Sequence, residues 1–473
     1  MGGGPSQRER KCSVRFAGVG AHPVTEPEPT PRQHPMPRWF GRRFGRWFGR
    51  VDPGEQLRLL QHSARHLLIG AVVGVLAGFG SAGFLHLLTW ATESREHHSW
   101  LVWLLPIGGL TVGSIYHFVG GESARGTNLV LDELHGDDLS VPVRMAPLVL
   151  FGATVTHLLG GSGGREGAAV QIAASLSSPL RRWLPDGERR VALVAAVAGG
   201  FGSVFGVPVA GAVFALEVQE SGRQRYDGIV AALGASVIGD RVTRALGIHH
   251  RLPTPLAAMT LTPSVALRVI AAAIAFGFAA LTFIELTHSI REGLARYVAF
   301  APARLAVGGV GVLVLMVVLH TRAYLGLSLP LIDVALAGAA VVSTAFAWKL
   351  LFTALTIGSG FPGGEVTPLF CIGACLGSVL AGPLGMSRVT LAALGFVAVY
   401  AAASNTPIAC TLLAVEVFGA AAIVPAAITC VVATQVSGQR SVYSRQRVST
   451  PAGPPYVAST MEDADRLRRS RRK

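Results

Sequence analysis

Charged residues are scarce in this sequence. Asp, Glu, Lys and Arg make up 14% of the 473 residues, 51% of the residues are hydrophobic, and the mean hydropathy is +0.48. A soluble protein of this length carries more charge than that. The composition therefore excludes an ordinary soluble protein and predicts a chain that folds in lipid.

Acidic residues are fewer than basic residues, which gives the chain a net charge of +14. Such an excess is typical of nucleic-acid-binding proteins, but here the basic residues collect at the two ends and in short connections, not on aromatic-rich surfaces. We therefore expect no nucleic-acid partner. Arginines cluster in residues 38–50 and 466–472, and the positive-inside rule then places both termini in the cytoplasm after an even number of crossings.

Cysteine is also rare, with five residues in the chain, four of them inside apolar stretches. Cysteines in such stretches are typically small buried hydrophobes. Cys371 and Cys375 lie one helical turn apart, but no histidine or acidic residue joins them on that face. We predict no metal site and no cofactor.

The first 54 residues lack an apolar run long enough for a signal peptide. They are rich in Arg, Pro and Gly, which predicts a disordered, basic, cytoplasmic extension over residues 1–54. Residues 38–50 mix aromatic residues with arginines, so binding of this part to an anionic membrane surface is an open alternative.

Apolar stretches nearly free of charge recur from His66 to Ser437. A membrane-spanning helix needs roughly 20 such residues, which predicts roughly ten to thirteen helical segments in an all-α, polytopic membrane protein. Gly or Pro interrupts many of the stretches, so several helices should be short, tilted or broken. The clearest stretches are Leu67–Ala91, Val191–Leu216, Val265–Leu286, Leu305–Leu319 and Leu391–Val415.

Two motifs show that the apolar region contains a repeat. Pro208 precedes Glu217 by nine residues, and Pro407 precedes Glu416 by nine residues, in similar surroundings. The copies lie 199 residues apart, since 407 − 208 = 199 and 416 − 217 = 199. Chance rarely places separate motifs at one offset.

A pair of glutamates in Gly-rich loops shows the same spacing, because Glu166 and Glu365 are also 365 − 166 = 199 residues apart. Related halves whose broken helices meet near the membrane midplane are typical of secondary transporters. We therefore predict a first half over about 60–247, a second half over about 262–447, and a binding site between them.

Each Gly-rich loop opens directly into an apolar helix. Residues 160–167 read Gly-Gly-Ser-Gly-Gly-Arg-Glu-Gly, and residues 358–368 read Gly-Ser-Gly-Phe-Pro-Gly-Gly-Glu-Val-Thr-Pro. Free N–H groups at a helix start, together with the helix dipole, bind an anion without a positive side chain. An anion held in this way can also be released, which suits a transporter.

A Gly-rich loop before a helix also occurs in nucleotide-binding enzymes. Here no Gly-Lys-Ser/Thr follows, and both flanks are apolar stretches of membrane length. The apolar segments also carry no visible nucleophile–base pair or metal cluster. We therefore predict that the protein is not an enzyme.

The loops resemble the signature loops of the CLC family of chloride channels and transporters, in Gly-Arg-Glu-Gly at 164–167 and Gly-Ser-Gly-x-x-Gly-Gly at 358–364. The resemblance runs from about Leu67 to about Arg447. It implies a CLC-type inverted repeat over residues 55–447, a basic cytoplasmic tail at 448–473, and a homodimer with one pore per subunit. It also implies a multi-pass protein of a bacterial-type plasma or inner membrane.

The resemblance also implies which residues form the anion path. Glu166 matches the family's external glutamate, which gates the pore and carries the proton in exchangers. Tyr443 matches a tyrosine whose hydroxyl touches the central anion. Gly126-Thr127-Asn128 stands where chloride-selective members have Gly-Ser-Gly-x-Pro, and Thr127 still offers a hydroxyl. The implied anion-binding residues are Thr127, Asn128, Gly164, Gly167, Gly364, Glu365, Val366, Thr367 and Tyr443.

Residues 363–368 depart from the usual family pattern, because Gly-Gly-Glu-Val-Thr-Pro replaces Gly-Gly-Ile-Phe-x-Pro. This departure resembles the bacterial fluoride-exporting clade, in which the residues matching Glu365 and Thr367 help to hold fluoride or the gating glutamate. A small, strongly hydrated anion needs more hydrogen-bond donors than chloride does. The prediction is fluoride/proton antiport across the lipid bilayer; a chloride channel or chloride/proton exchanger of the same fold is the alternative.

Some other polar residues of the apolar region carry structural predictions. Glu217 and Glu416 are expected to cap or pair at the inner ends of their helices. Val218 aligns with the internal proton-transfer glutamate of chloride exchangers, which the fluoride-exchanging clade also lacks. His157 is expected to be a buried, hydrogen-bonded residue, and Lys349 to extend to the membrane surface.

Overall fold

A computed structural model describes residues 53–136, 140–221, 226–250, 253–448 and 459–460. The chain divides into two units, Met1–Arg58 and Leu59–Lys473, and the account below concerns the second. Residues 1–52 and most of the tail lie outside the described residues. The predicted N-terminal extension and the predicted cytoplasmic tail therefore stay predictions.

The first half is built from helices of very unequal length, as the interrupted apolar stretches predict. Its described residues also form 3₁₀ helices, a short π-helix (η2) and a short strand. Its elements are α2 (Pro53–His97), η1 (Ser99–Leu104), α3 (Leu105–Ile115), η2 (Tyr116–Gly120), η3 (Gly121–Arg125), α4 (Thr127–Leu134), α5 (Met145–Leu158), α6 (Glu166–Leu176), α7 (Ser178–Arg181), α8 (Asp186–Phe205), α9 (Pro208–Glu217), β1 (Glu220–Ser221), η4 (Tyr226–Gly228) and α10 (Ile229–Ala245).

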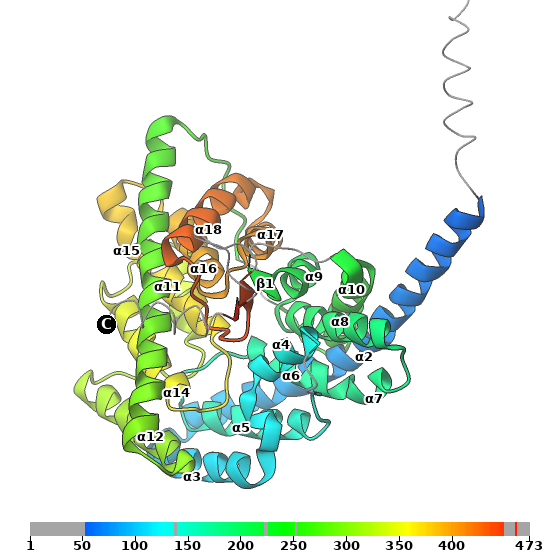
Figure 1. Cartoon of the computed structure of the whole chain (residues 1–473). Coiled ribbons are helices and arrows are strands. Elements are labelled where there is room, and N and C mark those ends of the chain that lie inside the picture. The colour runs from blue at the N-terminus through cyan, green and yellow to red at the C-terminus, as the bar shows by residue number, and fades with distance from the viewer. Residues whose placement is uncertain (1–52, 137–139, 222–225, 251–252, 449–458, 461–473) are drawn as a thin grey trace, which may run out of the picture. The chain divides into compact units, whose positions relative to one another are not determined.

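The second half repeats much of this order and lies beside the first (Figure 1). Its elements are α11 (Pro263–Tyr297), α12 (Ala301–Val318), α13 (Leu329–Leu336), α14 (Ala345–Gly358), α15 (Val366–Leu384), α16 (Arg388–Ser404), α17 (Pro407–Phe418), η5 (Ala420–Ala422), α18 (Ile423–Ser437), β2 (Arg447–Val448) and β3 (Ser459–Thr460). Strand β2 pairs with β1 in parallel and with β3 antiparallel. This small sheet joins the connection after α9 in the first half to the chain that follows Tyr443.

The apolar composition reflects both a packed interior and an apolar outer surface. Six continuous helical segments of the described residues are long and apolar enough to cross a membrane, and α11, α12 and α15 each form one of them. Five shorter helices are also apolar. On α12, Val307, Val310, Val314 and Val317 are about half exposed. Apolar side chains in such positions are stable only when lipid surrounds them. The protein is therefore a multi-pass membrane protein.

Both halves break a helix at the same place in the repeat. Gly206 ends α8 with a left-handed φ of 74°, and α9 begins at Pro208. Asn405 ends α16 with a left-handed φ of 54°, and α17 begins at Pro407. Gly and Asn tolerate this conformation best, and proline fits the first turn of a helix because its missing N–H would be unpaired there.

Two predicted apolar stretches are therefore not single helices. Val191–Leu216 runs from α8 into α9, and Leu391–Val415 runs from α16 into α17. Hydropathy did not reveal the breaks because the residues around them are small and apolar. Pro208 and Pro407 each stand at the start of a new helix, so each marks a complete interruption.

Each half supplies the cap for a helix of the other half. The Glu416 carboxylate accepts hydrogen bonds from the main-chain N–H groups of Val209 (2.9 Å) and Ala210 (2.7 Å) at the start of α9. Glu217 caps the start of α17 in the same way, at 3.1 and 2.8 Å. These N–H groups have no partner within their own helices. The structural role predicted for the two glutamates is confirmed, and α9 and α17 lie side by side as a result (Figure 1).

Helices α15 and α16 pack backbone against backbone. A Cβ atom added to Gly373 would lie 1.9 Å from the carbonyl oxygen of Gly395, and one added to Gly395 would lie 2.1 Å from the carbonyl oxygen of Gly373. Only glycine at both positions permits this approach. The close packing fixes α15, whose first turn carries Val366 and Thr367.

We expect Gly373→Ala to lower the thermal unfolding midpoint of the purified protein in detergent. The added methyl group must push α15 and α16 apart, and overpacking of this kind costs about 1–3 kcal/mol. Gly382→Ala is the matched control, because a Cβ at this position of the same helix meets nothing within 4 Å. Equal unfolding midpoints for the two variants would contradict the packing described.

Candidate functional site

The two Gly-rich loops pair directly with one another. The N–H of Gly364 donates to the carbonyl oxygen of Gly164 at 2.8 Å, and the N–H of Gly164 donates back to the oxygen of Gly364. A Cβ at Gly364 would lie 2.9 Å from the nitrogen of Gly167, so a larger residue does not fit. This bridge places the start of α6 beside the start of α15.

Glu166, the first residue of α6, reaches across to the start of α15. Its side chain is fully buried. Its Oε2 accepts hydrogen bonds from the N–H groups of Thr367 and Arg165, both at 3.1 Å. Its Oε1 accepts from the hydroxyl of Thr367 at 2.5 Å. The carboxylate therefore occupies the donor groups that an anion at this helix start would use.

A small cavity of about 10 Å³ adjoins Glu166. That volume corresponds to roughly one water-sized particle. Its polar lining comes from Thr127, Glu166 and Tyr443, next to the first residues of α6 and α15. The remaining wall is apolar, which leaves little room for a hydration shell. The apolar lining residues are Val130, Leu131, Val170, Val197, Phe201, Phe214, Val218 and Val366.

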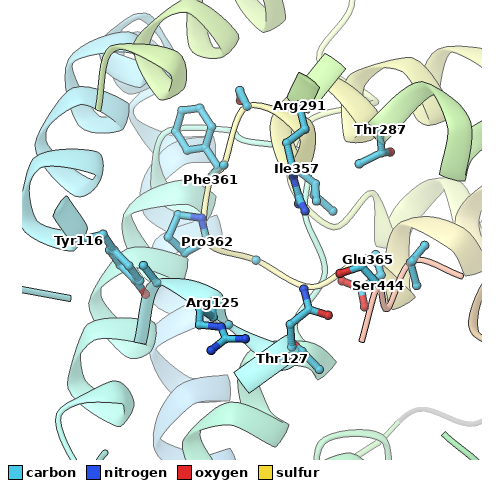
Figure 2. Close-up of a pocket in the computed structure, with 18 of the residues that line it drawn as sticks. Tyr116, Arg125, Thr127, Thr287, Arg291, Ile357, Phe361, Pro362, Glu365 and Ser444 are labelled. Carbon is cyan, nitrogen blue, oxygen red and sulfur yellow. The ribbon is translucent and has the colours of Figure 1, made fainter. Parts of the chain in front are cut away.

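A much larger cavity of about 570 Å³ adjoins the small one, and Thr127 and Tyr443 line both. We call it the vestibule. Figure 2 shows Thr127 and Glu365 at one end of it, with the loop of Phe361 and Pro362 along its wall. Thr127 and Tyr443 therefore stand where the vestibule narrows toward Glu166.

Glu365 differs from its repeat partner Glu166 in its surroundings. It precedes α15 and lines the vestibule. One carboxyl oxygen, Oε1, is buried with no hydrogen-bond partner among the described residues. Tyr443 lines the same cavity, and its hydroxyl is 3.3 Å from the hydroxyl of Tyr400. Glu365 and the two tyrosines are thus the polar groups that gather beside the narrow point.

Thr127 is oriented by a residue that the sequence did not single out. The side-chain Nε2 of Gln171 donates to Thr127 Oγ1 at 3.0 Å. Because Oγ1 accepts this hydrogen bond, its own proton is free to point toward an anion. Gln171 lies in α6, the helix that begins at Glu166. The sequence does not show which residue an amide side chain in an apolar helix contacts, so the contact with Thr127 could not be predicted.

Asn128 lines the vestibule but not the small cavity. Its Oδ1 accepts a hydrogen bond from the N–H of Arg445 at 3.4 Å. Asp132 on the same helix forms ion pairs with Arg125 and Arg445. Asn128 and Asp132 thus hold the segment that carries Tyr443 against α4.

The predicted anion-path residues come together at the meeting of the two halves, although their roles remain predictions. Gly164 and Gly364 form the bridge, Thr367 binds Glu166, and Thr127 and Tyr443 mark the narrow point. The other four surround these groups: Asn128 and Glu365 in the vestibule, and Gly167 and Val366 at the small cavity.

The prediction that Lys349 extends to the membrane surface was wrong. Its side chain is fully buried. The ammonium group donates to Ser162 Oγ (2.9 Å) and to the carbonyl oxygens of Tyr324 (3.2 Å) and Gly326 (2.7 Å). Three oxygen acceptors replace the water that a surface position would offer, so burial is possible. Through its contact with Ser162, Lys349 thereby holds the first Gly-rich loop in place.

The prediction for His157 is confirmed, since the ring is fully buried and hydrogen-bonded. Its Nδ1 lies 2.8 Å from the carbonyl oxygen of Ala153, and its Nε2 lies 3.3 Å from that of Gly163. The ring supports the first Gly-rich loop.

Comparison with known proteins agrees with this architecture. Residues 108–438 match the family model described as voltage gated chloride channel. A chloride/fluoride channel protein of Pseudomonas syringae pv. tomato is 41% identical over 404 residues, which cover 83% of this chain and 89% of the relative. The voltage-gated ClC-type chloride channel ClcB of Escherichia coli is 27% identical, over 79% of this chain and 96% of the relative.

Solved structures show the same fold. A crystal structure of a CLC-type fluoride/proton antiporter superposes with a TM-score of 0.79 at 32% identity, over 82% of this chain and 98% of that one. A slow cyanobacterial Cl⁻/H⁺ antiporter superposes with a TM-score of 0.68 at 21% identity, over 79% of this chain and 94% of that one, and shows the fold alone.

The fold and the paired helix starts define a membrane transport protein. The chain belongs to the CLC family, whose members are anion channels and transporters and not enzymes.

Proposed function

We propose that this protein is a fluoride/proton antiporter that exports fluoride, with Glu166 as gate and proton carrier. The observation that carries the proposal is the position of the Glu166 carboxylate on the N–H and hydroxyl of Thr367. A carboxylate and an anion cannot share these donors. Each therefore displaces the other, which is the exchange that an antiporter needs.

Protonation of Glu166 opens the site in this scheme. A proton removes the charge of the carboxylate, weakens its hold on Thr367 and frees the helix start for the anion. When the anion leaves, the side chain loses its proton on the opposite side and returns. The alternating occupancy couples the two movements.

Fluoride fits the donors better than a larger halide does. It is small and strongly hydrated, so leaving water requires short, charge-assisted hydrogen bonds in return. The Thr367 hydroxyl, the helix-start N–H groups and the oriented hydroxyl of Thr127 would supply them, in a cavity of about 10 Å³. The relatives named for fluoride point the same way.

Glu365 is the acidic residue best placed to pass protons between the vestibule and Glu166. Val218 lines the small cavity, and a valine cannot carry a proton. Glu365 lines the vestibule and directly precedes α15, whose first turn Glu166 contacts. The buried, unpartnered oxygen of its carboxyl group has capacity to exchange a proton with an entering water chain.

The proposal includes an orientation and an assembly. The arginines gathered near both ends of the chain favour cytoplasmic termini by the positive-inside rule, and we place the mouth of the vestibule on the same side. The homodimer follows from the family resemblance.

We expect wild-type protein in liposomes to release fluoride in preference to chloride while protons move in the opposite direction. Glu166→Gln should abolish proton movement, because glutamine has no exchangeable acid. A fluoride electrode and a pH electrode read the two fluxes together. Chloride release by the wild type without proton movement would contradict the proposal and indicate a chloride channel.

Thr367→Val should slow fluoride efflux by about tenfold or more. Valine keeps the shape but removes the hydroxyl, and a hydrogen bond to a charged group contributes about 1.5–3 kcal/mol. Thr367→Ser, which retains the hydroxyl, should stay within about threefold of wild type. Equal rates for valine and serine would mean that the hydroxyl takes no part in transport.

A further inference from the structure

Two buried amide side chains hold the segment 440–446, which carries Tyr443. Asn405 lies at the end of α16, and Gln446 lies in the segment itself. The Nδ2 of Asn405 donates to the carbonyl oxygen of Arg440 at 2.8 Å and to the Oε1 of Gln446 at 3.4 Å. The segment is therefore bound on both sides of Tyr443. We call Asn405 and Gln446 the amide pair.

The amide pair also completes the end of α16. The last carbonyl oxygens of a helix have no partner within it. The oxygen of Ser404 accepts from the Nε2 of Gln446 at 3.0 Å, and the oxygen of Ala403 accepts from the N–H of Val442 at 2.9 Å. The helix end and the segment thus satisfy each other's polar groups, and a shift of either one would leave buried groups unpaired.

Tyr443 is held in place through its neighbours in this arrangement. Its N–H donates to Ser441 Oγ at 3.1 Å, and its carbonyl oxygen accepts from the N–H of Gln446 at 3.1 Å. Its hydroxyl is 3.3 Å from that of Tyr400, which lies on α16. The position of the Tyr443 ring at the narrow point therefore depends on how the segment sits on the end of α16.

The repeat indicates that the side chain of Asn405 has a purpose. Gly206 occupies the corresponding place in the first half, since 405 − 206 = 199, and both residues have a left-handed φ. Glycine adopts this conformation with the least strain, so an asparagine there indicates that its amide is used. In the first half a Cβ at Gly206 would lie 2.4 Å from the ring of His250, so no side chain fits.

We propose that the amide pair fixes the width of the narrow point by positioning Tyr443, and that it thereby contributes to halide selectivity. Asn405 and Gln446 are positioning residues, because neither lines the small cavity or the vestibule in the described structure. Both act through Tyr443, which lines both cavities. The inference deepens the proposed function and rests on it for fluoride as the favoured ion.

A less firmly held Tyr443 would favour the larger halide. The small cavity has room for roughly one water-sized particle, so chloride enters it more easily when part of the wall can yield. Fluoride gains less from extra room, because it needs short hydrogen bonds from donors that stay in place. Loss of the amide pair should therefore lower the ratio of fluoride efflux to chloride efflux.

The test measures this ratio in liposomes for Asn405→Gly and Gln446→Met. Glycine retains the left-handed turn and removes only the amide, and methionine keeps the length of the glutamine side chain. We expect each variant to lower the ratio by about threefold or more, the effect of losing hydrogen bonds of ordinary strength.

Ser437→Ala is the matched control. Ser437 Oγ, at the end of α18, donates to the carbonyl oxygen of Ala402 at 2.8 Å, so this variant also removes a hydrogen bond to the last turn of α16. Ser437 lies outside the segment 440–446. The ratio for Ser437→Ala should stay within about twofold of wild type.

A double-mutant cycle separates positioning of Tyr443 from a general weakening of the fold. Tyr443→Ala leaves the amide pair with no ring to position, so adding Asn405→Gly should change the ratio by less than about twofold. The thermal unfolding midpoint in detergent should fall on adding Asn405→Gly with either residue at 443, because the hydrogen bond to Arg440 is lost in both cases.

Two results would overturn the inference. One is an unchanged ratio in both Asn405→Gly and Gln446→Met. The other is an equal fall in the ratio whether residue 443 is tyrosine or alanine, which would mean that the amide pair supports the fold and not Tyr443. A failure of the proposed function is seen separately, in a wild-type ratio that favours chloride. A change of ratio that depends on Tyr443 would still support the amide pair in that case.

Discussion

The hydrogen-bonded bridge between Gly164 and Gly364 is the contact on which the rest of the site depends. It joins the two halves by their main chains, so no side chain has to fill the space between the helix starts. The N–H groups of α15 then come within reach of a carboxylate from α6. Because the donors belong to the backbone, they are fixed in place and carry only partial charges, which suits an ion that must bind and leave.

Around this contact the protein divides its polar groups by depth. Hydroxyl and backbone donors hold Glu166 beside the small apolar cavity, and the guanidinium group of Arg165 contacts its Oε1 at 3.4 Å without lining that cavity, whereas four arginines line the vestibule. A guanidinium group lining the small cavity would bind an anion tightly in low dielectric. The buried ammonium of Lys349 is compatible with this rule, since carbonyl and hydroxyl oxygens already occupy its donors.

The sequence predicted the elements whose signals are local or repeated. The spacing of Glu166 from Glu365 and of Glu217 from Glu416 revealed the two halves, and the Gly-rich loops revealed the helix starts. It could not show that each glutamate of the second pair caps the opposite half, nor that Gln171 orients Thr127, because these contacts join residues that are distant in the chain. The prediction for Lys349 was wrong for the same reason, because its three hydrogen-bond acceptors lie in loops that flank other helices. Hydropathy did not locate the breaks after Gly206 and Asn405, because it does not detect a change of backbone conformation.

The reciprocal caps of Glu217 and Glu416 have a consequence for how the protein is made. Synthesis delivers Glu217 to the membrane long before the start of α17 that it caps, and the start of α9 must wait still longer for Glu416. Until then the first half holds an uncompensated carboxylate and a helix end with unpaired N–H groups. The first half cannot reach its final structure during its own insertion, so the last step of biogenesis is a mutual one, in which the two halves complete each other at once.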